Sequence, residues 1–169
     1  MLYLRKAGLG DIEEEYALIC DMPADENGML NEWAGISFDE FRDTALRSMA
    51  EYSAGVDLPE GYVPETFYFL WNGGEAVGLF RLRQRLCPSL VNGGGHVGYY
   101  VKRRYRNMGF ASEGLRLLLE EAKSIVPEDE IYLRVRKNNP ASLRVMLKNG
   151  GYISGENENE YFVRIKQEK

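Results

Sequence analysis

Alternating and continuous runs of hydrophobic residues mark the strands that the sequence predicts. The runs lie at residues 2–6, 66–71, 75–86, 96–101 and 130–136, with a final hairpin over residues 152–166. Asn72-Gly73-Gly74 separates the second and third runs, and a polar, glycine-containing turn of this length is typical of a β-hairpin. In the fourth run the side chains alternate, so Val97, Tyr99 and Val101 share one face of a strand.

Hydrophobic positions three and four residues apart predict the helices. They cover residues 11–20, 37–55, a segment that follows Gly109, and residues 140–149. Ser37 and Glu40 have the spacing of a capping box, and Gly55 ends the same helix. The helix after Gly109 carries one apolar stripe, formed by Ala111, Leu115, Leu118, Ala122 and Ile125. Residues 21–35, 56–64 and 87–95 are expected to be loops.

The order of these elements predicts an α/β fold. Strands and helices follow one another as β-α-α-β-β-β-α-β-α-β-β, without an internal repeat or a linker. This order favours a mixed β-sheet with helices on both faces. A length of 169 residues fits one domain with a substantial core, so we expect residues 1–169 to form a single domain.

Composition and charge exclude several classes of protein. A net charge of −5 gives no indication of nucleic-acid binding. No apolar run approaches the ~20 residues of a membrane span, and the N-terminus lacks the apolar stretch of a signal peptide, so a cytoplasmic protein without membrane contact is expected. Two cysteines and one histidine exclude a Cys/His zinc site and make a disulfide framework unexpected.

A basic turn before a helix is the most informative local feature of this acidic chain. Lys102, Arg103, Arg104 and Arg106 precede Gly109, which stands at the predicted helix start. Unpaired N–H groups and the helix dipole make such a start suitable for an anion, although a plain connection is an equally good reading of one short motif. The glycine spacing fits neither a P-loop nor a dinucleotide fingerprint.

Several segments together resemble the GCN5-related N-acetyltransferase superfamily. Arg106-Asn107-Met108-Gly109-Phe110-Ala111 resembles its [QR]-x-x-G-x-[GA] acetyl-CoA signature, and the Asn139–Ser142 segment, NPAS, resembles a second shared segment. A subfamily of predicted acetyltransferases is closer still. Its pattern is matched, in order, by Gly61–Pro64, Arg81–Leu86, Gly94–Tyr99, the acetyl-CoA turn and Lys148–Gly151.

The resemblance implies a splayed sheet that holds acetyl-CoA in the splay, with no metal. The pyrophosphate would lie on the amides of residues 106–111, and the pantetheine arm would run along the strand near Tyr99 and Val101. Asn139 would contact the pantetheine amides, with the N-cap of the following helix as its alternative role. An amine would attack the thioester directly, without a covalent enzyme intermediate.

The resemblance also suggests candidates for the two proton transfers. His96 stands where many relatives carry a glutamate, and its ordinary pKa near ~6.5 suits a general base; a hydrogen bond across the sheet is the alternative. Many relatives use a tyrosine as the acid toward the thiolate, in the slot that Met146 fills here. Ser142 is the candidate acid, with a helix-start hydroxyl as its alternative role, and Tyr99 and Tyr100 remain further candidates.

The acceptor and the assembly are the least determined parts. The leading hypothesis is an acetyl-CoA-dependent N-acetyltransferase acting on a primary amine of a small molecule or peptide. A non-catalytic acyl-CoA sensor is the alternative, and a structural domain is the third. Arg81, Arg83 and Arg85 share one face of a strand. They could bind a carboxylate or phosphate of the substrate, or they could form a solvated edge of the sheet. Acidic residues in the first 60 positions favour a cationic acceptor. The oligomeric state is open, a homodimer included.

Overall fold

Two β-sheets form the framework of the computed structural model, which describes residues 1–169. The strands are β1 (Leu2–Lys6), β2 (Asp25–Glu26), β3 (Met29–Leu30), β4 (Glu65–Asn72), β5 (Glu75–Arg83), β6 (Val97–Val101), β7 (Glu130–Arg136), β8 (Tyr152–Glu156) and β9 (Glu160–Lys166). The helices are α1 (Ile12–Asp21), α2 (Phe38–Glu40), α3 (Leu46–Ala54), α4 (Pro88–Val91), α5 (Phe110–Ala122) and α6 (Pro140–Lys148). A π-helical segment, η1 (Phe41–Ala45), joins α2 to α3, and a 3-10 turn, η2 (Arg103–Tyr105), follows β6.

The larger sheet has the strand order β1-β4-β5-β6, and each neighbouring pair is antiparallel. Its central strands are buried on both faces, which explains why β4 reads as an almost continuous apolar run. Phe67, Phe69 and Trp71 belong to one hydrophobic core, whereas Tyr68 and Leu70 belong to the other. The predicted hairpin is confirmed, with the turn at Gly73 between β4 and β5.

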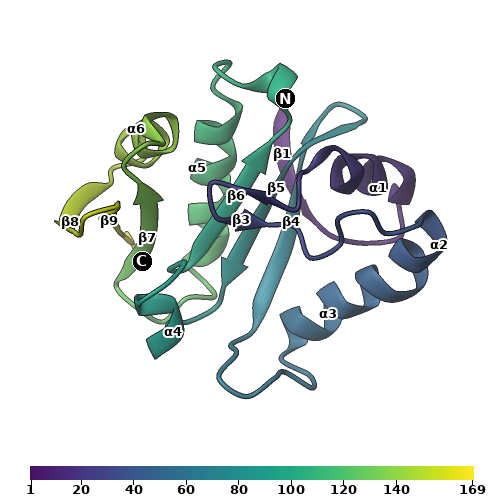
Figure 1. Ribbon diagram of the computed structural model, residues 1–169, viewed down its shortest axis with the longest axis horizontal. Helices are drawn as coiled ribbons and strands as arrows, with labels where there is room; N and C mark the ends of the chain where they lie inside the picture. Colours follow the sequence, from purple (N-terminus) through teal and green to yellow (C-terminus); the bar gives the residue numbers. More distant parts are fainter.

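The smaller sheet has the order β7-β9-β8, also antiparallel, and it diverges from the larger one. The two sheets meet at the start of β6, where Gly95 and Leu133 form an isolated bridge and the His96 N–H donates to Tyr132 O (2.7 Å). Figure 1 shows the resulting opening between β6 and β7. The splayed arrangement therefore comes from pairing at one end of these strands.

Helices cover both faces of the larger sheet (Figure 1). α1 and α3 pack on one face, where Leu18, Phe41 and Met49 contribute to the core. α5 packs on the other face, where Leu115 and Leu118 belong to a hydrophobic core that contains residues of both sheets. The predicted α/β fold, with splayed strands and helices on both faces, is confirmed, but the strands form two antiparallel sheets in place of one mixed sheet.

Local signals in the sequence agree with the helix ends. The Ser37 hydroxyl accepts from the Glu40 N–H (3.3 Å), and the Glu40 carboxylate accepts from the Ser37 N–H (3.1 Å), so the predicted capping box is present. Gly55 has φ 72° and ends α3 in the left-handed conformation. No helix combines the length and apolar character that spanning a membrane requires.

Two predicted loops contain regular structure. β2 and β3 form a small hairpin within residues 21–35, with positive φ at Asn27 (55°) and Gly28 (86°). An Asn-Gly pair with these dihedrals is the preferred two-residue turn of a β-hairpin. Residues 87–95 contain α4, a single turn that begins at Pro88. The hairpin lies across β6, where Met29 Sδ lies 3.0 Å from the position that a Cβ on Gly98 would take.

Candidate active site

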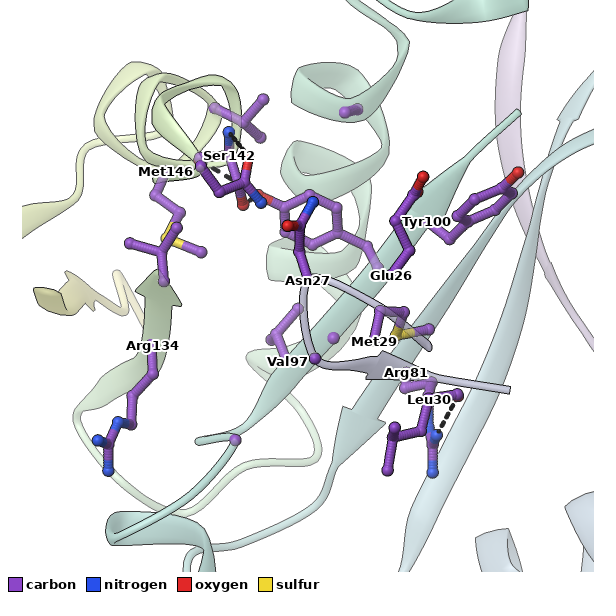
Figure 2. A pocket seen from close by; sticks show the side chains of 18 of the residues that line it. Glu26, Asn27, Met29, Leu30, Arg81, Val97, Tyr100, Arg134, Ser142 and Met146 are labelled. Carbon is purple, nitrogen blue, oxygen red and sulfur yellow. Dashed lines mark hydrogen bonds between the residues drawn. The ribbon is translucent and has the colours of Figure 1, made fainter. Parts of the chain in front are cut away.

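A cleft of about 1030 Å³ occupies the opening between the two sheets. β6 and the start of α5 line one side, β7 and α6 line the other, and the β2–β3 hairpin lies across it. Figure 2 shows Ser142 and Met146 on α6 and Val97 on β6, with Asn27 on the hairpin in front of them. The splay thus produces one continuous cavity that is bordered by elements from both halves of the chain.

One end of the cleft is the N-terminus of α5. Gly109 is its N-cap residue with φ 83°, and the first helical hydrogen bond runs from the Glu113 N–H to Gly109 O (3.0 Å). No protein acceptor takes the N–H groups of Phe110 and Ala111, as expected for the first turn of a helix. A Cβ on Gly109 would meet nothing within 4 Å, so this side of the turn is open space. The geometry is that of an anion site.

Most of the predicted cofactor residues line the cleft. They are Tyr99, Val101, Arg106, Asn107, Gly109, Phe110, Ala111, Asn139 and Ser142. Met108 does not line it, and its side chain is exposed (60 %). The predicted turn therefore contributes to the cavity through every position except Met108.

The basic residues of the turn are paired with carboxylates. Arg106 donates from Nε to Val101 O (3.0 Å), and its guanidinium binds the Glu26 carboxylate at 2.5 and 3.3 Å. Lys102 and Arg104 both contact Glu75. Glu26 belongs to β2, so the hairpin is tied by an ion pair to the turn that precedes α5. The sequence pattern does not reveal this link, because it predicts a loop over residues 21–35.

The free edge of β6 borders the middle of the cleft. The Lys102 N–H donates to Val77 O on β5 (2.9 Å). Because peptide groups alternate in direction along an antiparallel strand, those of Tyr99 and Val101 point away from β5, toward the opening. Val101 O already accepts from Arg106. The peptide groups of Tyr99 thus remain available to an extended ligand, in the place where the family resemblance predicts the pantetheine arm.

Tyr99 and Ser142 meet across the cleft. The Tyr99 hydroxyl lies 2.6 Å from Ser142 Oγ and also donates to Ser142 O (3.3 Å). Burial raises the pKa of Tyr99 to about 12, so the phenol is protonated at neutral pH. Asn139 Oδ1 accepts from the Ser142 N–H (3.3 Å), which fixes the start of α6 as the N-cap alternative predicted. The pair can donate a proton to a ligand atom between the sheets.

His96 lies outside the cleft, in the junction between the sheets. Its side chain is fully buried, its Nδ1 accepts from the Tyr132 N–H (2.9 Å), and its Nε2 lies 3.3 Å from the Glu128 carboxylate. Burial lowers the pKa of His96 despite the nearby carboxylate, which keeps the imidazole neutral. The geometry supports the cross-sheet hydrogen bond, the alternative role that the sequence left open, and it gives the ring no contact with the cavity.

The opposite end of the cleft holds a cluster of arginines and carboxylates. Arg81 donates to Glu65 through Nε and an NH2 group (2.9 Å each), to Glu32 (2.9 Å) and to Leu30 O (3.1 Å). Figure 2 shows Arg81 beside Leu30 of the hairpin. The interpretation as a solvated edge is wrong for Arg81, because β5 lies between β4 and β6 and Arg81 is buried.

Comparison with known proteins identifies the fold. Spermidine N-acetyltransferase from Vibrio cholerae, solved with CoA and spermine, superimposes with a TM-score of 0.63 at 16 % identity, covering 99 % of this chain and 96 % of that one. An acetyltransferase of the GNAT family from Streptococcus pneumoniae gives 0.64 at 17 % identity, covering 98 % and 99 %. The Salmonella typhimurium enzyme that modifies the N-terminal serine of ribosomal protein L7/L12 gives 0.62 at 18 %, covering 96 % and 91 %.

The match to a family sequence model covers most of the chain. No curated protein matches it significantly in sequence. The sequence model of the acetyltransferase (GNAT) domain matches residues 2–151, which include the turn at Gly109 and both residues of the Tyr99–Ser142 pair. The chain therefore belongs to the GCN5-related N-acetyltransferase (GNAT) family, and it is an acyltransferase of that family.

Proposed function

We propose that the protein transfers the acetyl group of acetyl-CoA to a primary amine by direct attack of that amine on the thioester. The observation that carries the proposal is the cleft itself, with an open helix N-terminus at one end and the Tyr99–Ser142 pair in the middle. Acetyl-CoA supplies the activated acetyl group when it is bound.

The residues of the turn fit a diphosphate group. Peptide N–H groups at the start of α5 are unpaired, and Gly109 leaves open the space that a side chain would occupy. We assign Arg106, Asn107, Gly109, Phe110 and Ala111 to this role through their backbone. The guanidinium of Arg106 is bound to Glu26 and Val101, so we infer that it positions the turn and the hairpin.

The Tyr99–Ser142 pair fits the role of the acid. A departing thiolate is stabilised when it gains a proton. Ser142 Oγ can donate its proton toward the opening while it accepts the hydrogen bond from the Tyr99 hydroxyl, which stays protonated because burial raises its pKa to about 12. This arrangement supports Ser142 as the candidate acid and adds Tyr99 as its partner.

The domain organisation, the subfamily and the acceptor class are also proposals. We infer that residues 1–169 act as one domain, because the cleft is lined by residues from Glu26 to Glu160. Assignment to the subfamily defined by the Gly94–Tyr99 and Lys148–Gly151 segments rests on those motifs. The acceptor class proposed from the sequence is a small-molecule or peptide amine.

An acyl-CoA sensor is the second candidate. Met146 fills the slot in which many relatives have a tyrosine acid, and it lies buried in the wall of the cleft. A sensor would need the cofactor end of the cleft and not the acid. The Tyr99–Ser142 pair is the feature that favours the enzyme.

Release of the CoA thiol, measured over a panel of amines, peptides and aminoglycosides, tests the proposal. We expect turnover with at least one acceptor, and we expect Ser142→Ala with Tyr99→Phe to slow it on the order of 100-fold. The affinity for acetyl-CoA should change far less. Tight binding of acetyl-CoA without turnover on any acceptor would favour the sensor instead.

A further inference from the structure

Arg81 and Arg83, at the end of β5, and Arg85, just after it, differ in how completely their charges are paired. Arg81 is buried, and its guanidinium is bound by Glu65, Glu32 and a backbone carbonyl. Arg85 is exposed and lies outside the cleft. Arg83 lines the cleft with its side chain 19 % exposed. Of these three arginines, Arg83 is therefore the one that lines the cleft without being fully enclosed.

Arg83 has weaker protein partners than Arg81. Its Nε lies 3.4 Å from a Glu65 oxygen that already accepts from Arg81, and one NH group donates to Gly95 O at 3.3 Å. The other NH2 group has no protein acceptor, and it is not among the fully enclosed polar atoms. Arg81 binds Glu65 through two N–H groups at once, whereas Arg83 makes no such pair and keeps a free terminal group, so Arg83 retains capacity for one more oxyanion.

The pKa shifts of Arg83 and Arg81 also differ, in agreement with the difference in their pairing. Burial lowers the pKa of Arg83, and Glu65 does not offset the effect. Burial also acts to lower the pKa of Arg81, but Glu65 and Glu32 more than offset it, so that pKa is raised. A buried guanidinium whose charge is incompletely compensated is stabilised by an added anion.

The register of the sheet places Arg83 at a defined distance from the acid pair. Tyr99 lies opposite Phe80, three residues before Arg83 on β5. Three residues along a strand separate the backbone positions by roughly 10 Å, and this odd spacing puts the side chains of Tyr99 and Phe80 on the opposite face of the sheet from that of Arg83, although Tyr99 and Arg83 both line the cleft. The region between contains Gly98, opposite Arg81, and the hairpin residue Met29. A ligand that reaches from the middle of the cleft to Arg83 therefore needs a chain of several bonds.

We propose that Arg83 recognises a carboxylate or phosphate on the acceptor, several bonds from the amine that is acetylated. The inference rests on the proposed acetyl transfer and names the acceptor class for the same site: amines that carry a remote anion. The acidic residues of the first 60 positions do not oppose it. Of these, Glu26 and Glu32 line the cleft, and each is paired with an arginine.

Matched pairs of acceptors test the role of Arg83. The pairs are 6-aminohexanoate with 6-aminohexanamide, and 6-aminohexyl phosphate with 6-aminohexanol, so that each pair differs in the anion and the two pairs distinguish carboxylate from phosphate. We measure kcat/KM for each acceptor by thiol release with the wild-type protein, Arg83→Gln, Arg83→Lys and the exposed control Arg85→Gln. Calorimetry gives the acetyl-CoA affinity of every variant.

The wild-type protein should prefer the anionic member of at least one pair by on the order of 10- to 100-fold. Arg83→Gln should abolish that preference, Arg83→Lys should retain part of it, and Arg85→Gln should retain all of it. The ratio within a pair is measured on one protein, so a general loss of folded enzyme cancels. Acetyl-CoA affinity should be unchanged in all variants, because Arg83 lies at the opposite end of the cleft from Gly109.

Equal use of both members by the wild-type protein, or an unchanged ratio in Arg83→Gln, overturns the role of Arg83 and leaves acetyl transfer standing. Acetyl-CoA binding without turnover on any of the four acceptors contradicts the proposed acceptor class. An absence of acetyl-CoA binding by the wild-type protein overturns the proposed function itself. These outcomes are distinct in the same set of measurements.

Discussion

Single residues set the local conformation on which the site depends, and Gly109 is the clearest case. Its φ of 83° lies in the left-handed region, where a side chain costs about 1 kcal/mol or more. The space around its missing Cβ is open, so a substitution meets strain and no protein clash. Gly73, in the β4–β5 turn, has φ 62° and the same open surroundings, but it lies outside the cleft.

Gly109→Ala and Gly73→Ala should therefore separate strain from binding. Both variants should lose about 1–2 kcal/mol of unfolding free energy, because both place alanine in the left-handed region. We expect Gly109→Ala alone to weaken acetyl-CoA binding, about tenfold or more, because its methyl group enters the space assigned to the diphosphate. Calorimetric titration measures the affinity. Equal affinities in the two variants would contradict the assignment of the turn.

Glu15 is a buried carboxylate that the proposed chemistry does not use. It accepts hydrogen bonds from the Gly8 N–H at 3.2 and 3.3 Å, and its side chain is inaccessible to solvent. Burial raises the pKa of Glu15 from 4.5 to about 7, with the Gly8 hydrogen bond and Arg5 acting against this. A raised pKa in the folded protein means that stability is lost as the pH rises from about 4.5 through about 7.

Glu15→Gln should consequently stabilise the protein at alkaline pH more than at acidic pH. Glutamine keeps the acceptor for Gly8 and cannot ionise. Relative to the wild-type protein, the gain should grow by roughly 1–3 kcal/mol between pH 5 and pH 8. Urea unfolding at the two pH values measures it. A gain of the same size at both values would show that Glu15 carries no buried charge at pH 8.

At the scale of elements, β6 is the strand that connects structure with function. The start of β6 is joined to β7 at His96. Beyond this point β6 separates from β7, and the cleft lies between the two strands. His96 has a lowered pKa, chiefly through burial, so its folded form is neutral. A histidine of this kind contributes stability that is present above its ordinary pKa near 6.5 and is lost as the pH falls.

His96→Ala tests this structural role against the base role considered from the sequence. At pH 7.5 the variant should lose about 1–3 kcal/mol, because the buried Tyr132 N–H loses its acceptor. The difference in unfolding free energy between the variant and the wild-type protein should shrink below pH 6.5, because the buried neutral imidazole makes the wild-type protein less stable there. In the acetylation assay, the pH–rate profile of the folded variant should keep its shape. A profile that loses an ionisation near neutral pH would restore His96 as a base.

The sequence predicted the elements with strong local signals and missed those without them. The capping box at Ser37 and the glycine at position 55 mark a helix through its own backbone chemistry. The β2–β3 hairpin carries the Asn27-Gly28 turn signal, but its strands have two residues each and show no alternation. The π-helical segment at Phe41–Ala45 lies within an uninterrupted helical pattern, so the sequence gives no sign of it.

At the scale of the whole molecule, the order of strands in the sheets determines features that local sequence patterns leave open. Alternation placed Arg81 and Arg83 on one face of a strand, but whether that strand lies at an edge depends on pairing with β4 and β6. The burial of His96 depends likewise on the contact between two sheets. The meeting of Tyr99 with Ser142 joins residues 43 positions apart in the chain. Local patterns cannot supply such contacts, and the family resemblance supplied only some of them.

The structure of the protein crystallised with CoA tests the central claim, that the cleft between β6 and β7 is the acetyl-CoA site. We expect the diphosphate on the backbone N–H groups at Gly109, Phe110 and Ala111, and the pantetheine arm along the free edge of β6. The CoA sulfur should lie within hydrogen-bonding distance of Ser142 Oγ. A diphosphate bound away from the start of α5, or a sulfur remote from the Tyr99–Ser142 pair, would contradict the account.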